Sequence, residues 1–197
     1  MDIFPISLKL QQQPCLIVGG GHIAYRKAVL LAKAGAVIHV IAPEIEANLL
    51  EIVKACQGQY VQSPFNPDIP LRNYRLVIAA TNDKATNIQV FEACEAEKIL
   101  VNSVDDPPHC RFMVPAIIDR SPLVVSIATN GTSPVLSRQI RTQLEASIPH
   151  GMGKLAEFSG KWRAAVKAKI ENPDERRIFW EDLYASPLKE QVFNDNI

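Results

Sequence analysis

The stretch Cys15-Leu16-Ile17-Val18-Gly19-Gly20-Gly21-His22-Ile23-Ala24 decides the fold of this 197-residue chain. Apolar residues precede a run of glycines, and a helical pattern begins directly after it. The spacing G-x-G-x-x-A is a permitted variant of the pattern with which a strand–turn–helix unit holds a dinucleotide pyrophosphate. Gly19 permits the tight turn, Gly21 lets phosphates approach the backbone, and Ala24 lets the helix pack close to the strand. The positive end of that helix would then face the phosphate charge.

Strand and helix patterns alternate from residue 14 to residue 104. A second strand-like run follows the glycine stretch at the distance of a βαβ unit, and runs such as 76–80 are apolar without alternation. That is typical of strands buried on both faces of a parallel sheet. The expected strands are 15–18, 37–42, 59–62, 75–80 and 99–104, and the expected helices are 22–34, 44–56 and 84–97. We therefore predict an α/β fold with a Rossmann-type, doubly wound parallel sheet.

The pattern changes after residue 105. Two apolar runs, 112–118 and 123–128, flank Asp119-Arg120-Ser121-Pro122, which predicts a turn between two antiparallel strands. A helical run then extends from Pro134 to about residue 147, and Thr132 or Ser133 can cap it. Two more helices are expected over 149–171 and 173–185. The second part of the chain is thus predicted to be a strand pair followed by helices.

Composition excludes several classes of protein. The formal net charge of zero argues against general nucleic-acid binding, and no apolar run approaches the roughly 20 residues that a membrane-spanning helix needs. The N-terminus has no basic segment and no long apolar segment, so no secretory signal is expected. The four cysteines are scattered without C-x-x-C spacing, which favours reduced thiols over a zinc site or disulfides. We expect a cytoplasmic protein.

Ligands of doubly wound sheets bind outside the carboxyl ends of the strands. Thr81 and Asn82 follow an apolar strand, where they could contact a nicotinamide or ribose or could cap the next helix. The acid that usually grips the adenosine ribose should end the second strand, but Glu44 comes a position or two late, after Pro43. Glu44 fits equally well as an acid in the first helical turn. No Arg is present there for a 2′-phosphate, which favours NAD over NADP.

Asp105 ends the last parallel strand and is expected at the nicotinamide end of the crevice. A carboxylate there could take a proton as a neighbouring carbon gives up hydride, or could bind a metal entering a nitrogen ligand. The alternative is that residues 105–108 form only a polar turn. His22, beside the predicted pyrophosphate, is assigned to positioning rather than to acid–base chemistry. His109 beside Cys110 resembles a metal pair only superficially, because adjacent residues rarely converge on one ion.

A second turn that suits anions precedes the helix that begins near residue 134. Asn130-Gly131-Thr132-Ser133 could cradle a substrate carboxylate with backbone amides, or could simply be a capped helix start. Four arginines could serve a polyanionic substrate or be solvated surface residues: Arg111, Arg120, Arg138 and Arg141.

Taken together, the motifs resemble the N-terminal half of siroheme synthase and its stand-alone relatives, the precorrin-2 dehydrogenase–sirohydrochlorin ferrochelatases. The resemblance covers nearly the whole chain in the right order. The segments that carry it are 16–24, 26–28, 78–83, 101–105, 115–120, 131–134, Arg138 and 175–180.

The resemblance implies NAD-dependent oxidation of the tetrapyrrole precorrin-2 to sirohydrochlorin, followed in many members by insertion of ferrous iron as a second substrate. Asp105 matches the family's essential aspartate, which is thought to serve both steps and could hold the metal transiently. The family's nucleotide contacts match His22-Ile23 and Pro43-Glu44. The substrate's carboxylates would suit Arg138 and the turn of residues 130–133.

The implied architecture is an intertwined homodimer. Its expected parts are an NAD-binding Rossmann domain over 1–112, a dimerisation segment over 113–148 and a helical C-terminal domain over 149–197. Fused relatives carry a methyltransferase half, whereas this chain stops at Ile197, so a separate uroporphyrinogen III methyltransferase is expected upstream. Relatives also often have an acidic residue where His22 stands.

Three other functions compete with this interpretation. One is a non-catalytic NAD-sensing regulatory module, against which the missing acid after the second strand and the long helical tail both count. Another is a dehydrogenase without chelatase activity, and nothing in the sequence separates it from the bifunctional enzyme. The third is a chelatase that does not use NAD, which the intact glycine turn disfavours.

Overall fold

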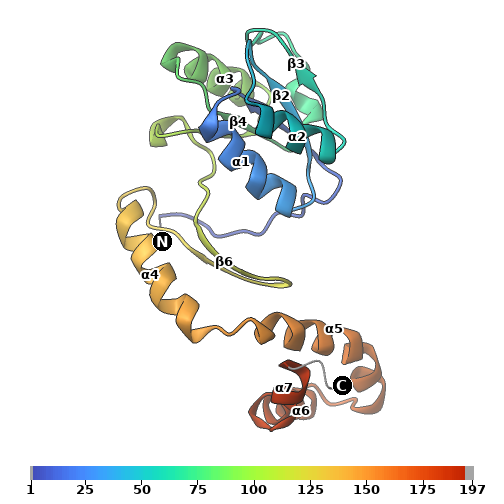
Figure 1. Ribbon diagram of the computed structural model, residues 1–197. Helices are drawn as coiled ribbons and strands as arrows, with labels where there is room; N and C mark the ends of the chain where they lie inside the picture. The colour runs from blue at the N-terminus through green and yellow to red at the C-terminus, as the bar shows by residue number, and fades with distance from the viewer. Residues whose placement is uncertain (1, 194–197) are drawn as a thin grey trace. The chain divides into compact units, whose positions relative to one another are not determined.

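The computed structural model describes residues 2–193, and the chain divides into two compact units, Met1–Met113 and Val114–Ile197. The first unit is built on a five-stranded parallel sheet with the order β3-β2-β1-β4-β5 (Figure 1). Its strands are β1 (Pro14–Val18), β2 (Val37–Ile41), β3 (Tyr60–Val61), β4 (Leu76–Ala79) and β5 (Leu100–Ser103). The strand order reverses between β1 and β4, which is the place where doubly wound sheets bind ligands.

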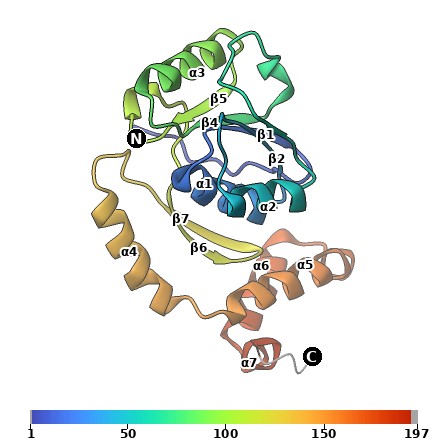
Figure 2. The ribbon, with the colours of Figure 1, turned by 45° about the horizontal axis from the view of Figure 1, so that its top comes forward.

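Helices cover both faces of this sheet (Figure 2). α1 (His22–Lys33) and α2 (Ala47–Ala55) pack on one face, and α3 (Lys84–Ala96) packs on the other. Two short 3-10 turns, η1 (Leu71–Asn73) and η2 (Pro107–His109), complete the unit. The predicted Rossmann-type sheet is confirmed.

Strand β1 lies at the centre of the core because it is apolar on both sides. Cys15, Leu16 and Ile17 are fully buried, and Val18 is nearly so. Burying one such Val, Leu or Ile side chain stabilises the fold by roughly 1.5–3 kcal/mol. On α1 the small residues Ala24 and Ala28 are also fully buried, and their size lets the helix lie close to the sheet. The sequence prediction for Ala24 agrees with this packing.

The second unit begins with the antiparallel hairpin of β6 (Ala116–Arg120) and β7 (Leu123–Ile127). The turn is shorter than the sequence suggested, because Asp119 and Arg120 pair within β6 and only Ser121 and Pro122 connect the strands. The helices that follow are α4 (Pro134–Ser147), α5 (Gly151–Lys169), α6 (Pro173–Ala185) and α7 (Leu188–Phe193). The short helix α7 was not predicted.

Local contacts hold the hairpin and the helices of this unit together. Arg120 donates from Nε to the carbonyl of Ile148, 3.1 Å away, and its guanidinium lies 3.6 Å from Glu145 of α4. Gly153 sits where a Cβ would come within 2.3 Å of the Arg120 carbonyl, so α5 meets the hairpin through a residue without a side chain. Across residues 2–193, no helix is both long enough and apolar enough to span a membrane.

Candidate dinucleotide site and the Asp105 turn

An open cleft of about 850 Å³ lies at the carboxyl ends of β1, β2 and β4. It brings together all eight residues that the sequence predicted for the cofactor: Gly19, Gly21, His22, Ile23, Pro43, Glu44, Thr81 and Asn82. It also includes residues that the sequence did not single out, among them Glu46, Pro64 and Phe65. The two side chains from the 63–70 loop join the cleft only because the chain returns to this edge of the sheet.

The three glycines of the turn have different roles. Gly19 has a φ of +124°, and a Cβ there would lie 2.4 Å from the Ala80 carbonyl oxygen. A Cβ on Gly20 would lie 1.8 Å from the Glu44 carbonyl oxygen. A Cβ on Gly21, by contrast, would meet no atom within 4 Å. Gly19 and Gly20 are therefore required by the packing of the protein itself, whereas Gly21 leaves open space that a ligand could fill.

The N-terminus of α1 has the features of an anion-binding helix start. Gly21 occupies the N-cap position, so no side chain satisfies the first amides of the helix, and its first turn contains no acidic residue. The Gly21 carbonyl accepts from the Tyr25 amide at 3.0 Å, which starts the helical hydrogen bonding. The remaining free amides and the helix dipole favour a phosphate at this point.

The turn that follows β2 closes one side of the cleft. The Glu46 amide donates to the Gly20 carbonyl at 2.8 Å, and the Tyr60 hydroxyl donates to the Ala42 carbonyl at 3.1 Å. Glu44 is exposed and stands before α2, which begins at Ala47, so it is not an acid of the first helical turn as one interpretation held. The cleft is lined by Glu44, Glu46 and Asp83 and, within the described part of the chain, by no Lys or Arg.

The end of β4 is held by a buried amide that sequence reasoning missed. Asn87, from the first turn of α3, donates to the Thr81 carbonyl at 3.0 Å and accepts from the Thr81 amide at 3.2 Å. The cap of α3 is neither Thr81 nor Asn82 but Asp83, whose carboxylate accepts from the amides of Ala85 and Thr86. Asn82 stays exposed at the cleft.

The cap also sets the ionisation of Asp83. The hydroxyl of Thr86, followed by the amides of Ala85 and Thr86, lowers the pKa of the Asp83 carboxyl. The carboxylate is therefore charged at the mouth of the cleft at neutral pH.

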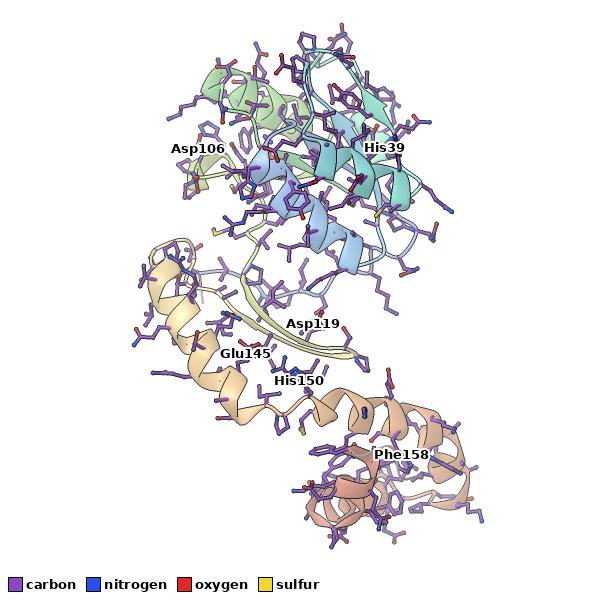
Figure 3. The ribbon with its side chains drawn as sticks, viewed as in Figure 1. His39, Asp106, Asp119, Glu145, His150 and Phe158 are labelled. Atoms are coloured by element: carbon purple, nitrogen blue, oxygen red, sulfur yellow. The ribbon has the colours of Figure 1, made fainter. Side chains whose placement is uncertain are left out.

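Asp105 lies on the turn after β5, and its backbone is left-handed with a φ of +58°. Its side chain is exposed, and we find no hydrogen bond or ion pair for it among residues 2–193. The neighbouring Asp106 differs, because its Oδ2 lies 2.9 Å from Nδ1 of His109 (Figure 3). Of the two adjacent carboxylates, that of Asp105 is the more exposed, and only that of Asp106 has a side-chain partner among the described residues.

A small cluster of side chains pins this turn to α3. The His109 ring packs edge-on against Phe91, with centroids 5.0 Å apart, and the Arg111 guanidinium lies 4.8 Å from the centre of the same ring. Arg111 also pairs with Glu95. His109 and Cys110 thus have structural contacts rather than a shared ion, and within the described residues no group of three or more His, Cys, Asp or Glu side chains is placed to hold a metal.

The chain after the turn returns to β5 through Cys110 and Asn102. The Cys110 thiol donates to the Ser103 carbonyl at 3.1 Å, and Asn102 Nδ2 donates to the Phe112 carbonyl at 3.0 Å. Burial raises the pKa of the Cys110 thiol, so it stays protonated. Asn102 Oδ1 is buried without a hydrogen-bond partner in the described structure.

The predicted substrate residues lie in the second unit. Asn130 and Gly131 have φ values of +51° and +74°, which turn the chain sharply before α4. Ser133, rather than Thr132, caps that helix by accepting from the Leu136 amide at 3.3 Å. Arg138 is exposed and donates through Nε to the Pro134 carbonyl at 3.2 Å.

The other three arginines are already paired within the protein. Arg111 pairs with Glu95, while Arg120 and Arg141 both approach Glu145. Arg120 is also largely buried, so its role is structural. Arg138 keeps the least engaged guanidinium of the four residues considered.

Comparison with known proteins places this architecture in a family. Residues 6–116 match the model described as "Putative NAD(P)-binding", and residues 151–197 match the "Sirohaem synthase dimerisation region". A siroheme synthase of Acinetobacter baylyi is 66% identical over all 197 residues, which cover 43% of that relative. A siroheme synthase of Chromobacterium violaceum is 46% identical over 194 residues, covering 98% of this chain and 41% of the relative.

A solved structure shows the same fold. SirC, a precorrin-2 dehydrogenase, superposes with a TM-score of 0.75 and 24% identity over 98% of both chains. The present chain spans about two fifths of the length of the curated relatives it matches. The chain therefore belongs to the family described as putative NAD(P)-binding, and over almost its whole length it is similar to siroheme synthases.

Proposed function

We propose that this chain oxidises precorrin-2 to sirohydrochlorin with NAD and then inserts ferrous iron into the product. The observation that carries the proposal is the unpaired, exposed Asp105 carboxylate on the strand end next to the dinucleotide cleft, together with a glycine turn that leaves open space at Gly21. The names of the relatives, siroheme synthase and precorrin-2 dehydrogenase, indicate the substrate class.

The cleft fits NAD. The open space at Gly21 and the uncapped start of α1 suit a pyrophosphate, which the backbone of Gly19, Gly21, His22 and Ile23 would hold. Pro43 and Glu44 would border the adenosine ribose, while Thr81 and Asn82 would border the nicotinamide half. The three carboxylates of the lining would repel a 2′-phosphate, which favours NAD over NADP.

Asp105 is proposed as the catalytic base. When bound, NAD supplies the acceptor for the hydride and its two electrons. The substrate must then lose one proton so that the ring gains a double bond, and the Asp105 carboxylate would take it. Because Asp105 is exposed, it can pass that proton to solvent and return to its charged form.

Ferrous iron is proposed as a substrate of the same site. Insertion of a divalent ion displaces two protons from ring nitrogens, and Asp105 could accept them or hold the ion transiently through an oxygen ligand. Dehydrogenase activity without this second step is the alternative that the experiment below separates.

We further propose a homodimer with the three parts 1–112, 113–148 and 149–197. The region that matches the dimerisation model exposes many large apolar side chains on its helices, and few residues there are buried. These exposed side chains are Trp162, Ile178, Phe179, Tyr184 and Leu188. In the second unit, Asn130, Gly131, Thr132, Ser133 and Arg138 are proposed to bind carboxylates of the tetrapyrrole.

The test is anaerobic incubation of the protein with NAD and with precorrin-2 made by an added uroporphyrinogen III methyltransferase. We expect NADH and the sirohydrochlorin spectrum to appear, and then an iron-dependent change to the siroheme spectrum faster than without protein. Asp105→Asn should lower NADH formation by roughly 10²- to 10⁴-fold, as expected for loss of a general base. Asp106→Asn is the matched control, because its amide oxygen can still accept from His109.

Three results would change the proposal. Full dehydrogenase activity in Asp105→Asn would remove the base role. NADH formation without faster iron insertion would leave a dehydrogenase alone. NAD binding without any NADH would point to a sensing module.

A further inference from the structure

Lys27 of α1 is a cation that forms no ion pair among the residues that the structure describes. It lies on α1 between the fully buried residues Ala24 and Ala28. It therefore stands at the edge of the helix face that packs on the sheet. It is half-buried, and it has no hydrogen bond or ion pair within residues 2–193. A half-buried ammonium without a partner loses hydration that nothing in the fold replaces.

The segments on either side of the Asp105 turn pack against the same apolar cluster as α1. Val104 and Phe112, which border this turn on either side, pack in the same apolar cluster as Ala24 and Ala28 of α1. The Asp105 carboxylate is close enough to Lys27 for its charge to act on the ammonium group. Asp105 does not form an ion pair with Lys27, and the carboxylate of Asp106 is occupied by His109.

The electrostatics of the region favour an incoming anion. Burial lowers the pKa of Lys27, the charge of Arg26 lowers it further, and the charge of Asp105 opposes these two effects. A ligand carboxylate beside the ammonium would replace the lost hydration and favour the charged form of Lys27. The dinucleotide phosphates are expected at the start of α1, more than one helical turn away from Lys27 in sequence.

We propose that Lys27 binds a carboxylate of the tetrapyrrole and so positions the oxidised carbon beside Asp105. This inference rests on the proposed function, because precorrin-2 and its product are the polycarboxylates that the site would receive. It adds a substrate contact in the first unit, near the proposed catalytic base. Lys27 acts on the orientation of the substrate and transfers no proton.

The experiment compares Lys27→Met, Lys27→Arg and the control Lys33→Met, which removes an exposed lysine from the last turn of the same helix. We expect Lys27→Met to raise the KM for precorrin-2 at least tenfold while the KM for NAD stays within twofold. Lys27→Arg should recover much of the loss, because it restores the charge. Lys33→Met should behave as the wild type.

Two further readouts separate binding from stability and from turnover. Fluorescence titration with sirohydrochlorin should show weaker binding to Lys27→Met by a similar factor. The melting temperature of Lys27→Met should equal or exceed that of the wild type, because methionine fills similar space without an unpaired charge. A lower melting temperature with unchanged sirohydrochlorin affinity would show a structural role and overturn the inference.

The outcomes also distinguish the inference from the function on which it rests. An unchanged KM for precorrin-2 in Lys27→Met, with an active wild type, would overturn the inference alone. A rise in the KM for NAD instead would show that the ammonium serves the cofactor, and this too would overturn it. A wild type that makes no NADH would overturn the proposed function, while the sirohydrochlorin titration would still decide whether Lys27 binds a carboxylate.

Discussion

Replacing Gly21 by Ala should weaken NAD binding without unfolding the protein. The Gly21 backbone has a φ of −92° and a ψ of −171°, which is extended and open to any residue, and a Cβ there meets no atom within 4 Å. We therefore expect the free energy of unfolding to change by less than about 1 kcal/mol, since exposed substitutions usually have small effects. The added methyl group would stand where the pyrophosphate must approach the backbone. A tenfold loss of affinity corresponds to about 1.4 kcal/mol, and we expect at least that.

The neighbouring Gly20 provides the contrast. A Cβ on Gly20 would overlap the Glu44 carbonyl oxygen at 1.8 Å, so the 43–46 turn would have to move. Overpacking of this kind costs roughly 1–3 kcal/mol. Gly20→Ala should therefore lower the melting temperature even in the absence of NAD.

Thermal unfolding with and without NAD measures both effects. Wild-type protein should gain stability as NAD is added, by mass action. Gly21→Ala should melt near the wild type but gain little from NAD, whereas Gly20→Ala should melt lower without ligand. Gly160→Ala, in α5 where a Cβ also meets nothing within 4 Å, is the control for an alanine in open space and should respond to NAD normally. A Gly21→Ala protein with an undiminished NAD response would refute the assignment of the pyrophosphate to this turn.

Two further changes test the cleft. Glu44→Arg should lower the KM for NADP several-fold and raise the KM for NAD, because it replaces a carboxylate that repels the 2′-phosphate with a cation. Steady-state kinetics with both cofactors measure this change. Unchanged cofactor selectivity would show that the ribose binds elsewhere. Asp83→Ala should destabilise the protein at neutral pH through loss of the α3 cap. Since the pKa of Asp83 is lowered in the folded state, its contribution is present above the pKa of the unfolded chain and is lost as pH falls through the folded pKa. The stability difference between wild type and Asp83→Ala should therefore shrink in acid, and a difference independent of pH would contradict the charged cap.

Features that depend on neighbours in sequence could be predicted well. The unbroken apolar run of β1, the glycine turn and the helix after it follow from local pattern, and the predicted cofactor residues all line one cleft. The carboxyl ends of parallel strands meet at one edge, so naming the strand ends was enough to bring these residues together.

Features that depend on contacts between distant residues could not be predicted in this way. A side chain at Gly20 is excluded by the carbonyl of Glu44. The backbone of Thr81 is held by hydrogen bonds with Asn87 in the next helix. Thr81 and Asn82 were plausible caps by residue type. Asp83 caps α3 instead, because it directly precedes the first helical residue, Lys84. The pairing of Arg120 with Glu145 could not be predicted either, because the sequence offers each arginine several glutamates as possible partners.

The sequence by itself thus determined the parallel sheet, the glycine turn and the strand ends that form the cleft, because period and residue type act over a few positions. The contrast between the two adjacent aspartates is local, since His109 pairs with Asp106 three residues before it and leaves Asp105, which the sequence singled out, exposed. Only the tertiary structure decided which glycine faces open space and that the half-buried Lys27 forms no ion pair among the described residues. These are questions of packing, and packing is settled by segments that meet in space after the chain has folded.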